Sequence, residues 1–252
     1  MDAATQQLHE GQASAAPKAV LLLIPGMLNG NDIWDGVIGV LSMKAGDSIR
    51  VVIGDVLTQS TIEDMARDAW GCLDGVAPGT PFYVAGFSMG GYVALEMLAN
   101  QKHPIREAWL LSTSALPESD ASAPVREKAI ASFESDFEKT IQNTARWGTF
   151  EKTAEQLQPV VQSMRKLGAA TAIRQTRAIM KRSDHRDRLR GLDIPVHVIC
   201  GKEDRITPMA LSQELARTIP SAQLQVVERT GHMLPFEQPA LLAESMGARI
   251  VG

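Results

Sequence analysis

The pentapeptide Gly86-Phe87-Ser88-Met89-Gly90 is the stretch of this sequence best suited to nucleophilic chemistry. An apolar run that begins at Phe82 precedes it and residues of helical type follow it, which predicts a strand, a sharp turn and a helix with Ser88 at the turn. Such a turn holds a serine in a strained backbone conformation and exposes its hydroxyl above the sheet edge. Glycines fit at 86 and 90 because a side chain at either position would collide across the tight strand–helix crossing.

Two further residues have the side chains that a serine nucleophile requires. A serine hydroxyl is a poor nucleophile, and it needs a base within hydrogen-bond reach that is itself oriented by an acid. Asp204 and His232 each follow a predicted strand, 194–200 and 223–228. Catalytic groups gather at the carboxyl ends of parallel strands, and Ser88 also follows a strand end. The chain order Ser–Asp–His is far more specific than the pentapeptide, which arises by chance in roughly one chain in ten of this length.

Each candidate also has a simpler explanation. Asp204 could cap a helix that begins near Pro208, and Glu203 is a rival acid, although Asp204 better fits the Asp-x-x-x-Pro spacing. His232 could be an ordinary loop histidine. The remaining histidines have no spacing typical of metal ligands, so we predict no metal site; they are His9, His103, His185 and His197.

The order of apolar segments predicts an α/β fold. Six strands are expected, over residues 18–24, 48–53, 81–86, 105–112, 194–200 and 223–228, with helices between them. This alternation favours a doubly wound, mostly parallel six-stranded sheet with crossovers on both faces. We expect a flexible N-terminal tail over 1–17 and a core formed by 18–113 and 193–252. Residues 114–192 show helical but no strand patterns, and we expect a helical cap insertion there.

Composition narrows the possible partners. The chain has 252 residues with 44% hydrophobic and 21% charged content, which is ordinary for a globular protein, and a net charge of −4, which does not favour nucleic acid. Cys72 and Cys200 lie in apolar segments and are expected to be buried thiols. The start of the sequence has no apolar core for a signal peptide, and residues 19–24 are too short to span a bilayer. We therefore expect a cytoplasmic protein without membrane contact.

Four motifs together resemble the α/β-hydrolase superfamily. They are Pro25-Gly26-Met27, the Ser88 pentapeptide, Gly201-x-x-Asp204-x-x-x-Pro208 and Gly231-His232. The likeness runs from about residue 18 to 250 and is closest to compact bacterial members that begin at the third family strand. It implies that Ser88 is the nucleophile, His232 the general base and acid, and Asp204 the orienting carboxylate.

The same resemblance implies an oxyanion hole and a sheet order. The backbone N–H groups of Met27 and Met89 would bind the oxyanion. The family usually has His-Gly before the first of these donors, and here Pro25 replaces the histidine. By the family's strand order, the six strands would run second–first–third–fourth–fifth–sixth, all parallel, with residues 48–53 on an edge.

These features predict a serine hydrolase, similar to a carboxylesterase, that cleaves an ester or related acyl bond of a small, largely apolar substrate through an acyl-enzyme. The alternatives are a C–C bond hydrolase, a perhydrolase or a lyase on the same three residues, and a non-catalytic ligand sensor.

Residues near the site in sequence or in the cap suggest a pocket of Trp34, Phe87, Trp147 and Met233. A basic stretch from Arg165 to Arg190 could attract an anionic substrate or simply be a solvated surface. No cofactor is expected, and the chain is expected to be a monomer or small homo-oligomer.

Overall fold

The computed structural model describes residues 17–251, in which six strands form one parallel sheet. In chain order the strands are β1 (Ala19–Ile24), β2 (Ile49–Ile53), β3 (Phe82–Phe87), β4 (Glu107–Leu111), β5 (Val196–Gly201) and β6 (Ala222–Val227). Their order in the sheet is β2-β1-β3-β4-β5-β6. This confirms the predicted doubly wound fold, the predicted order and the edge position of the second strand. Residues 1–16 of the expected tail lie outside the described part of the chain.

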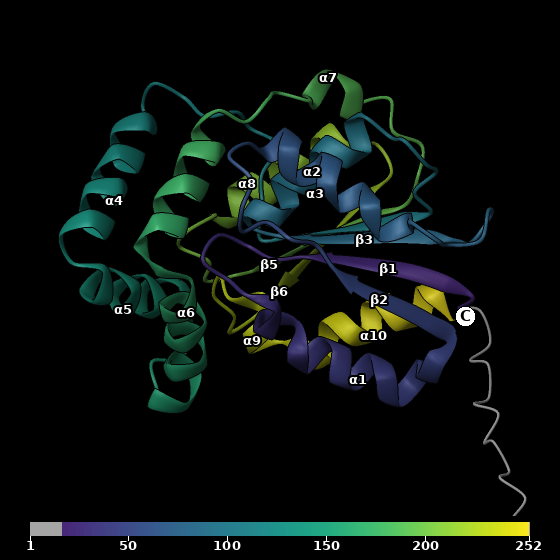
Figure 1. The fold of residues 1–252 in the computed structure, drawn as a ribbon, viewed down its shortest axis with the longest axis horizontal. Helices are drawn as coiled ribbons and strands as arrows, with labels where there is room; N and C mark the ends of the chain where they lie inside the picture. Colours follow the sequence, from purple (N-terminus) through teal and green to yellow (C-terminus); the bar gives the residue numbers. More distant parts are fainter. Residues whose placement is uncertain (1–16, 252) are drawn as a thin grey trace, which may run out of the picture.

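The sheet is covered on both faces, as its uninterrupted apolar strands require. One face carries α2 (Ile62–Ala69), α3 (Met89–Ala99) and α8 (Met209–Thr218), and the other carries α1 (Asp35–Ala45) and α10 (Pro239–Ile250) (Figure 1). All six residues of β1 are buried. Because successive side chains of a strand point to opposite faces, alternate residues of β1 belong to two separate hydrophobic cores.

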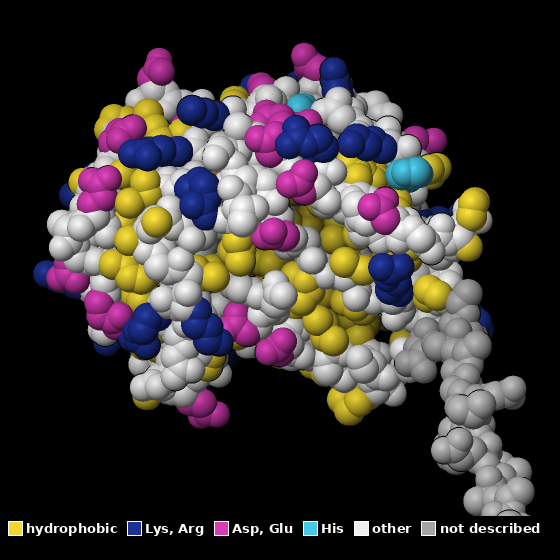
Figure 2. Space-filling view, in the orientation of Figure 1, with side chains coloured by type: hydrophobic (Ala, Val, Ile, Leu, Met, Phe, Trp, Pro, Cys, Tyr) yellow, Lys and Arg dark blue, Asp and Glu magenta, His cyan; other side chains and the backbone are white. Residues whose placement is uncertain are grey.

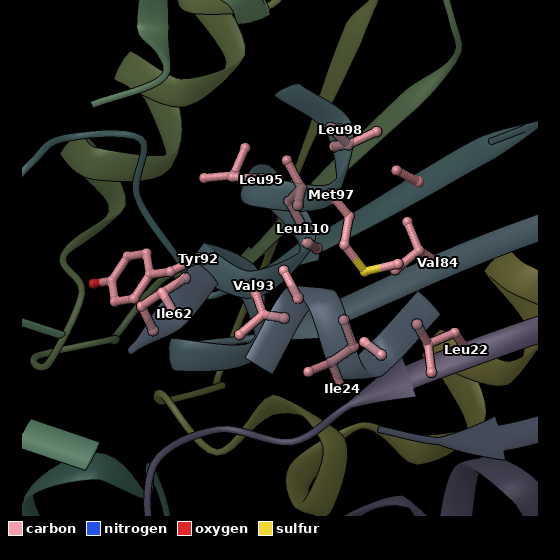
Figure 3. Packing of buried hydrophobic residues seen from close by; sticks show 14 of the residues in the cluster. Leu22, Ile24, Ile62, Val84, Tyr92, Val93, Leu95, Met97, Leu98 and Leu110 are labelled. Carbon is pink, nitrogen blue, oxygen red and sulfur yellow. The ribbon is translucent and has the colours of Figure 1, made fainter. Parts of the chain in front are cut away.

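The core on the α2 and α3 side places α3, the helix that follows Ser88, directly on the central strands. Figure 3 shows Leu22 and Ile24 of β1 and Val84 of β3 beside Val93 and Met97 of α3. These aliphatic side chains fill the space between the sheet and α3. The start of α3, where Ser88 lies, is therefore held against the carboxyl ends of β1 and β3.

Local signals explain where several helices begin. The Thr61 hydroxyl accepts a hydrogen bond from the Asp64 N–H at 3.0 Å and so caps α2. Two helices close the chain, α9 (Leu234–Glu237) and α10, because Pro239 has no N–H to continue the first helix and begins a new one. Short 3₁₀ segments are η1 (Asn31–Trp34), η2 (Gly46–Ser48) and η3 (Trp70–Leu73).

Four helices stand between β4 and β5 in the chain. They are α4 (Ala123–Ser135), α5 (Phe137–Gly148), α6 (Ala154–Met180) and α7 (Arg186–Leu189). The first three lie beside one end of the sheet, whereas α7 packs on α3 with the core helices (Figure 1). The long helix α6 is kinked at Gly168, whose φ is +77°. Within residues 17–251, no helix is both long and apolar enough to cross a bilayer.

Candidate active site

Ser88 occupies the turn between β3 and α3 in a conformation that is rare for a residue with a side chain. Its φ is +51° and its ψ is −114°. The turn is tight because a Cβ atom at Gly86 would lie 2.3 Å from the carbonyl oxygen of Gly90, and one at Gly90 would lie 2.2 Å from that of Ile24. Glycine is therefore required at both positions. The strained turn leaves Ser88 partly exposed at the carboxyl end of β3.

The structure brings the three predicted catalytic side chains together. His232 Nε2 lies 3.0 Å from Ser88 Oγ, and His232 Nδ1 lies 2.8 Å from Asp204 Oδ2. Asp204 and His232 are only 5% and 3% exposed. The imidazole is thus placed between a hydroxyl and a carboxylate in a nearly dry environment, which strengthens both hydrogen bonds.

The Asp204 carboxyl is held in its ionised form. Burial by itself would raise its pKa, but the charge and hydrogen bond of His232 act in the opposite direction. The N–H groups of Ile206 and Thr207 also donate to Asp204 Oδ1, at 2.9 and 2.8 Å. Together these groups hold the pKa of Asp204 below its ordinary value. An ionised Asp204 fixes the Nδ1–H tautomer of His232, so that Nε2 is free to accept a proton from Ser88.

The loops that carry Asp204 and His232 are packed against each other. A Cβ atom at Gly201 would lie 2.2 Å from the carbonyl oxygens of Thr230 and Gly231, so glycine is needed where the two loops meet. The rival acid Glu203 accepts a hydrogen bond from the Thr230 N–H at 2.9 Å and supports the histidine loop. The alternative role for Asp204 as a helix cap does not hold, because α8 begins at Met209 with Pro208 as its N-cap.

Thr207 is a site residue that the sequence reasoning missed. Its Oγ1 lies 2.8 Å from Asp204 Oδ2, 3.1 Å from His232 Nδ1 and 2.9 Å from the carbonyl oxygen of Ser112 at the end of β4. The hydroxyl therefore links the acid and the base to the central sheet. A hydroxyl residue directly before Pro208, three positions after the acid, was the available signal.

The two amides predicted for an oxyanion hole belong to different elements. Met89 is the first residue of α3, and a first-turn N–H has no partner within its helix. Met27 follows β1, and among residues 17–251 its N–H has no hydrogen-bond acceptor. The positive end of the α3 dipole faces the same rim. These positions suit the binding of a negative charge beside Ser88.

The residues predicted for a substrate pocket lie in two environments. Trp34, Phe87 and Met233 are at most 3% exposed and share one buried cluster, and the Phe87 ring lies 5.2 Å from the His232 ring. Trp147 is 56% exposed and lies against the loop that carries Asp204, where its Nε1–H donates to the Arg205 carbonyl oxygen at 3.4 Å. Their part in a substrate pocket stays a prediction.

The described histidines outside the site have structural partners. His185 is hydrogen-bonded to Glu96, His197 Nε2 lies 2.9 Å from Glu107 Oε2, and His103 packs against Trp70. Within residues 17–251, no cluster of three or more His, Cys, Asp or Glu side chains has an arrangement that could hold a metal ion.

More than half of the cations in the basic stretch from Arg165 to Arg190 are paired with acids, three of them with acids outside the stretch. Five of its nine cations form ion pairs in the structure: Arg165 with Glu138, Lys166 with Asp32, Arg182 with Glu118, Arg186 with Asp184, and Arg190 with Asp187. Figure 2 likewise shows Lys and Arg side chains interspersed with Asp and Glu over the visible face. This arrangement favours a solvated surface over an anion-attracting patch.

Comparison with known sequences assigns the family. A profile of the "Alpha/beta hydrolase family" matches residues 21–245, which span almost the whole sheet, the helices between β4 and β5, and the site. The chain belongs to the α/β hydrolase family.

Curated relatives of the chain include esterases. Pimeloyl-[acyl-carrier protein] methyl ester esterases of Neisseria meningitidis are 26% identical over 165 residues in serogroup A and 28% identical over 166 residues in serogroup C. Each match covers 62% of this chain, but only 53% and 64% of those relatives. The chain thus matches about half to two thirds of their length.

Solved structures share the fold over nearly the full chain. An esterase from Thermogutta terrifontis superposes with a TM-score of 0.80 at 22% identity, covering 94% of this chain and 90% of that chain. An enol-lactonase from Burkholderia xenovorans superposes with a TM-score of 0.74 at 20% identity, covering 94% and 91%. At these identities the likeness establishes the fold, and family membership supports hydrolase chemistry.

Proposed function

We propose that this protein is a serine hydrolase that cleaves an ester or related acyl bond of a small, largely apolar substrate. The observation that carries the proposal is the continuous chain of hydrogen-bond distances from Ser88 Oγ through the His232 imidazole to the Asp204 carboxylate, 3.0 and 2.8 Å. A hydroxyl, a base and an orienting acid at these distances suit nucleophilic attack on a carbonyl carbon.

The proposed reaction has two halves. Ser88 Oγ attacks the carbonyl carbon while His232 Nε2 takes its proton, and the oxyanion receives hydrogen bonds from the Met27 and Met89 amides. His232 then gives the proton to the leaving alcohol, which leaves an acyl group on Ser88. A water molecule, deprotonated by His232, attacks this acyl-enzyme, releases the carboxylic acid and regenerates the serine. Asp204 stays ionised and stabilises the imidazolium at each step.

Ester cleavage is favoured among the acyl reactions by what the comparisons name. The Neisseria relatives are called methyl ester esterases, and the Thermogutta structure is called an esterase. An apolar acyl group is favoured by the apolar Phe87 ring, which lies 5.2 Å from the His232 ring, and by Met233, the next residue in the chain after His232. The fold alone does not select the bond that is cleaved.

Replacement of the nucleophile tests the proposal. Ser88→Ala should lower kcat on p-nitrophenyl acetate and butyrate by about a thousandfold or more without changing the circular dichroism spectrum. Ser183→Ala, which removes a hydroxyl bonded to Glu63 away from the site, is the matched control and should keep full activity. Activity of the Ser88→Ala variant within tenfold of the unmodified protein would remove Ser88 from the mechanism.

A serine-directed phosphonate separates the remaining possibilities. Labelling of Ser88 together with ester turnover is the expected result. Labelling of Ser88 without ester turnover would favour C–C bond hydrolysis, perhydrolysis or a lyase reaction on the same residues. Neither labelling nor turnover would favour a ligand sensor.

A further inference from the structure

In the turn after β1, three successive N–H groups, those of Leu28, Asn29 and Gly30, have acceptors. The Asn29 N–H closes the turn by donating to the Gly26 carbonyl oxygen at 3.2 Å, and the Gly30 N–H donates to Ser163 Oγ at 3.2 Å. The Leu28 N–H donates to Gln175 Oε1. Met27 lies within this turn, and its N–H has no acceptor among the described residues. The direction of that free amide is therefore set by the peptide units on either side of it.

The turn contains a conformation that it would not readily adopt alone. Leu28, its third residue, has a φ of +56°. This left-handed region favours glycine or asparagine at the third position of a turn and is costly for a large side chain. Leu28 is also fully buried, so the turn is packed against the protein rather than free to relax into solvent. An interaction that specifically holds the Leu28 peptide is needed to keep the turn in this form.

Gln175 supplies that interaction from a distant part of the chain. Its Oε1 accepts the Leu28 N–H at 2.9 Å, and its Nε2 donates to the Val56 carbonyl oxygen at 2.9 Å. The side chain is fully buried in α6. Only one orientation of the amide satisfies both contacts, because a flipped amide would direct its NH₂ at the Leu28 N–H and its oxygen at the Val56 carbonyl. The side chain is thus locked between the turn and the loop after β2.

We propose that Gln175 is a positioning residue for catalysis, which holds the Leu28 peptide so that the adjacent Met27 N–H points at the oxyanion. The inference rests on the proposed function and adds to it a residue of α6 that contacts neither substrate nor the reacting atoms. The oxyanion hole is then assembled in part by a helix inserted between β4 and β5. A shift of α6 would turn the Met27 amide away from the site.

Gln175→Met tests the role, since it removes both hydrogen bonds and nearly keeps the side-chain length. We expect kcat on p-nitrophenyl acetate to fall about 10- to 100-fold with little change in KM, because the lost interaction serves the transition state. On the matching thionoester, in which sulfur replaces the carbonyl oxygen, the kcat of the variant should fall less than about threefold. Sulfur is a weak hydrogen-bond acceptor and gains little from the amide donors.

Two control variants separate positioning from general damage. Gln158→Met makes the same substitution at an exposed site on α6 and should leave both esters unaffected. Arg182→Met removes a side chain that joins the end of α6 to the Leu116 carbonyl oxygen and to Glu118. These contacts lie away from the turn at residues 26–29, here called the oxyanion turn. Arg182→Met should lower the Tm without changing the ratio of oxygen-ester to thionoester activity. Equal losses on both esters in the Gln175→Met variant would overturn the inference.

Gln175→Glu provides a conservative rescue. A buried carboxyl group takes up a proton more readily than an exposed one, and in its neutral form it offers an acceptor to Leu28 and a donor to Val56. In a plot of kcat against pH, we expect this variant to keep most of the activity at acidic pH. On the alkaline side it should lose activity as the introduced carboxyl ionises, whereas the unmodified protein should not.

Hydrogen exchange at the Leu28 amide tests the contact without turnover. In the Gln175→Met variant this amide should exchange at least about tenfold faster than in the unmodified protein, while amides in β5 should be unchanged. Unchanged exchange at Leu28, or an unchanged kcat, would overturn the inference. Failure of the proposed function is distinct, because it appears in the unmodified protein as absent ester turnover, with or without labelling of Ser88.

Discussion

Thr207 shows how one hydroxyl can organise the proposed acid–base pair of Asp204 and His232. Its Oγ1 lies within hydrogen-bond distance of Asp204, His232 and the Ser112 carbonyl oxygen, and it is nearly inaccessible to solvent. It has one proton to donate, so it donates to either the carboxylate or the carbonyl while the imidazole N–H points toward it and Asp204. This arrangement limits rotation of the carboxylate and thereby fixes the plane of the imidazole.

Thr207→Val should lower kcat about tenfold, because the methyl group that replaces the hydroxyl leaves Asp204 with one donor fewer and a freer orientation. Asp204→Asn should lower kcat by about 10⁴-fold, because it favours the wrong imidazole tautomer, and this loss is the upper limit for the effect of Thr207. Steady-state kinetics on p-nitrophenyl acetate measure both. Thr218→Val, a buried threonine on α8 that donates to the Glu214 carbonyl oxygen, is the matched control. A Thr207→Val variant as active as this control would contradict the role given to Thr207.

At the scale of elements, the kink in α6 lets one helix hold the oxyanion turn at two points. Ser163, before Gly168, accepts the Gly30 N–H, and Gln175, after Gly168, accepts the Leu28 N–H. Gly168 has a φ of +77° and a ψ of 167°, a region that only glycine occupies readily. The kink therefore depends on the residue type at position 168 and not on packing there, since a Cβ would meet no atom within 4 Å.

Two Gly→Ala substitutions should have opposite effects on stability although neither creates a clash. Gly168→Ala should lower the free energy of unfolding by about 1–2 kcal/mol because alanine is strained at positive φ. Gly39→Ala, in the exposed interior of α1 with no atom within 4 Å of the added Cβ, should raise it by about 0.5–1 kcal/mol. Urea unfolding of both variants measures the difference. If Gly168→Ala were also stabilising, the kink would not depend on glycine.

At the scale of the whole molecule, the segment at the end of α5 is joined to the core at the loop that carries His232. The backbone N–H of His232 donates to the carbonyl oxygen of Gly148, the last residue of α5, at a distance of 2.5 Å. The Glu237 carboxylate accepts N–H groups from Phe150, at 2.8 Å, and from Gly231. Glu237 thus connects the segment after α5 to the histidine loop. Burial raises the pKa of Glu237 above its ordinary value despite these donors.

The raised pKa predicts a pH window for stability. The unfolded chain releases the Glu237 proton near the ordinary value of 4.5, whereas the folded protein holds it to higher pH. The folded state then binds more protons than the unfolded state, so this contribution to the unfolding free energy falls as pH rises from about 4.5 to the raised pKa. Glu237→Gln keeps an acceptor oxygen and removes the titration. Its stability relative to the unmodified protein should therefore increase as pH rises through this window, as measured by urea unfolding at several pH values. A difference that is constant or falls with pH would contradict the assignment.

The sequence alone was sufficient for features that depend on neighbouring residues. Each predicted strand agrees with the structure to within two residues, because apolar periodicity and flanking glycines are local properties. The turn at Ser88 follows from two glycines whose side chains would clash, and the places of Asp204 and His232 follow from the rule that parallel strands present their carboxyl ends to one rim.

Only the tertiary structure decided the contacts between distant segments. Gln175 reaches the Leu28 amide 147 positions away, and Glu237 reaches Phe150 across 87 positions. Nothing in the local pattern of a helix indicates which far segment its polar side chains will meet. Three of the nine cations in the basic stretch from Arg165 to Arg190 are paired with Asp32, Glu118 and Glu138, which lie elsewhere in the chain. Hydrogen bonds and ion pairs act over a few ångströms in space, so their partners are fixed by the path of the folded chain and not by order along it.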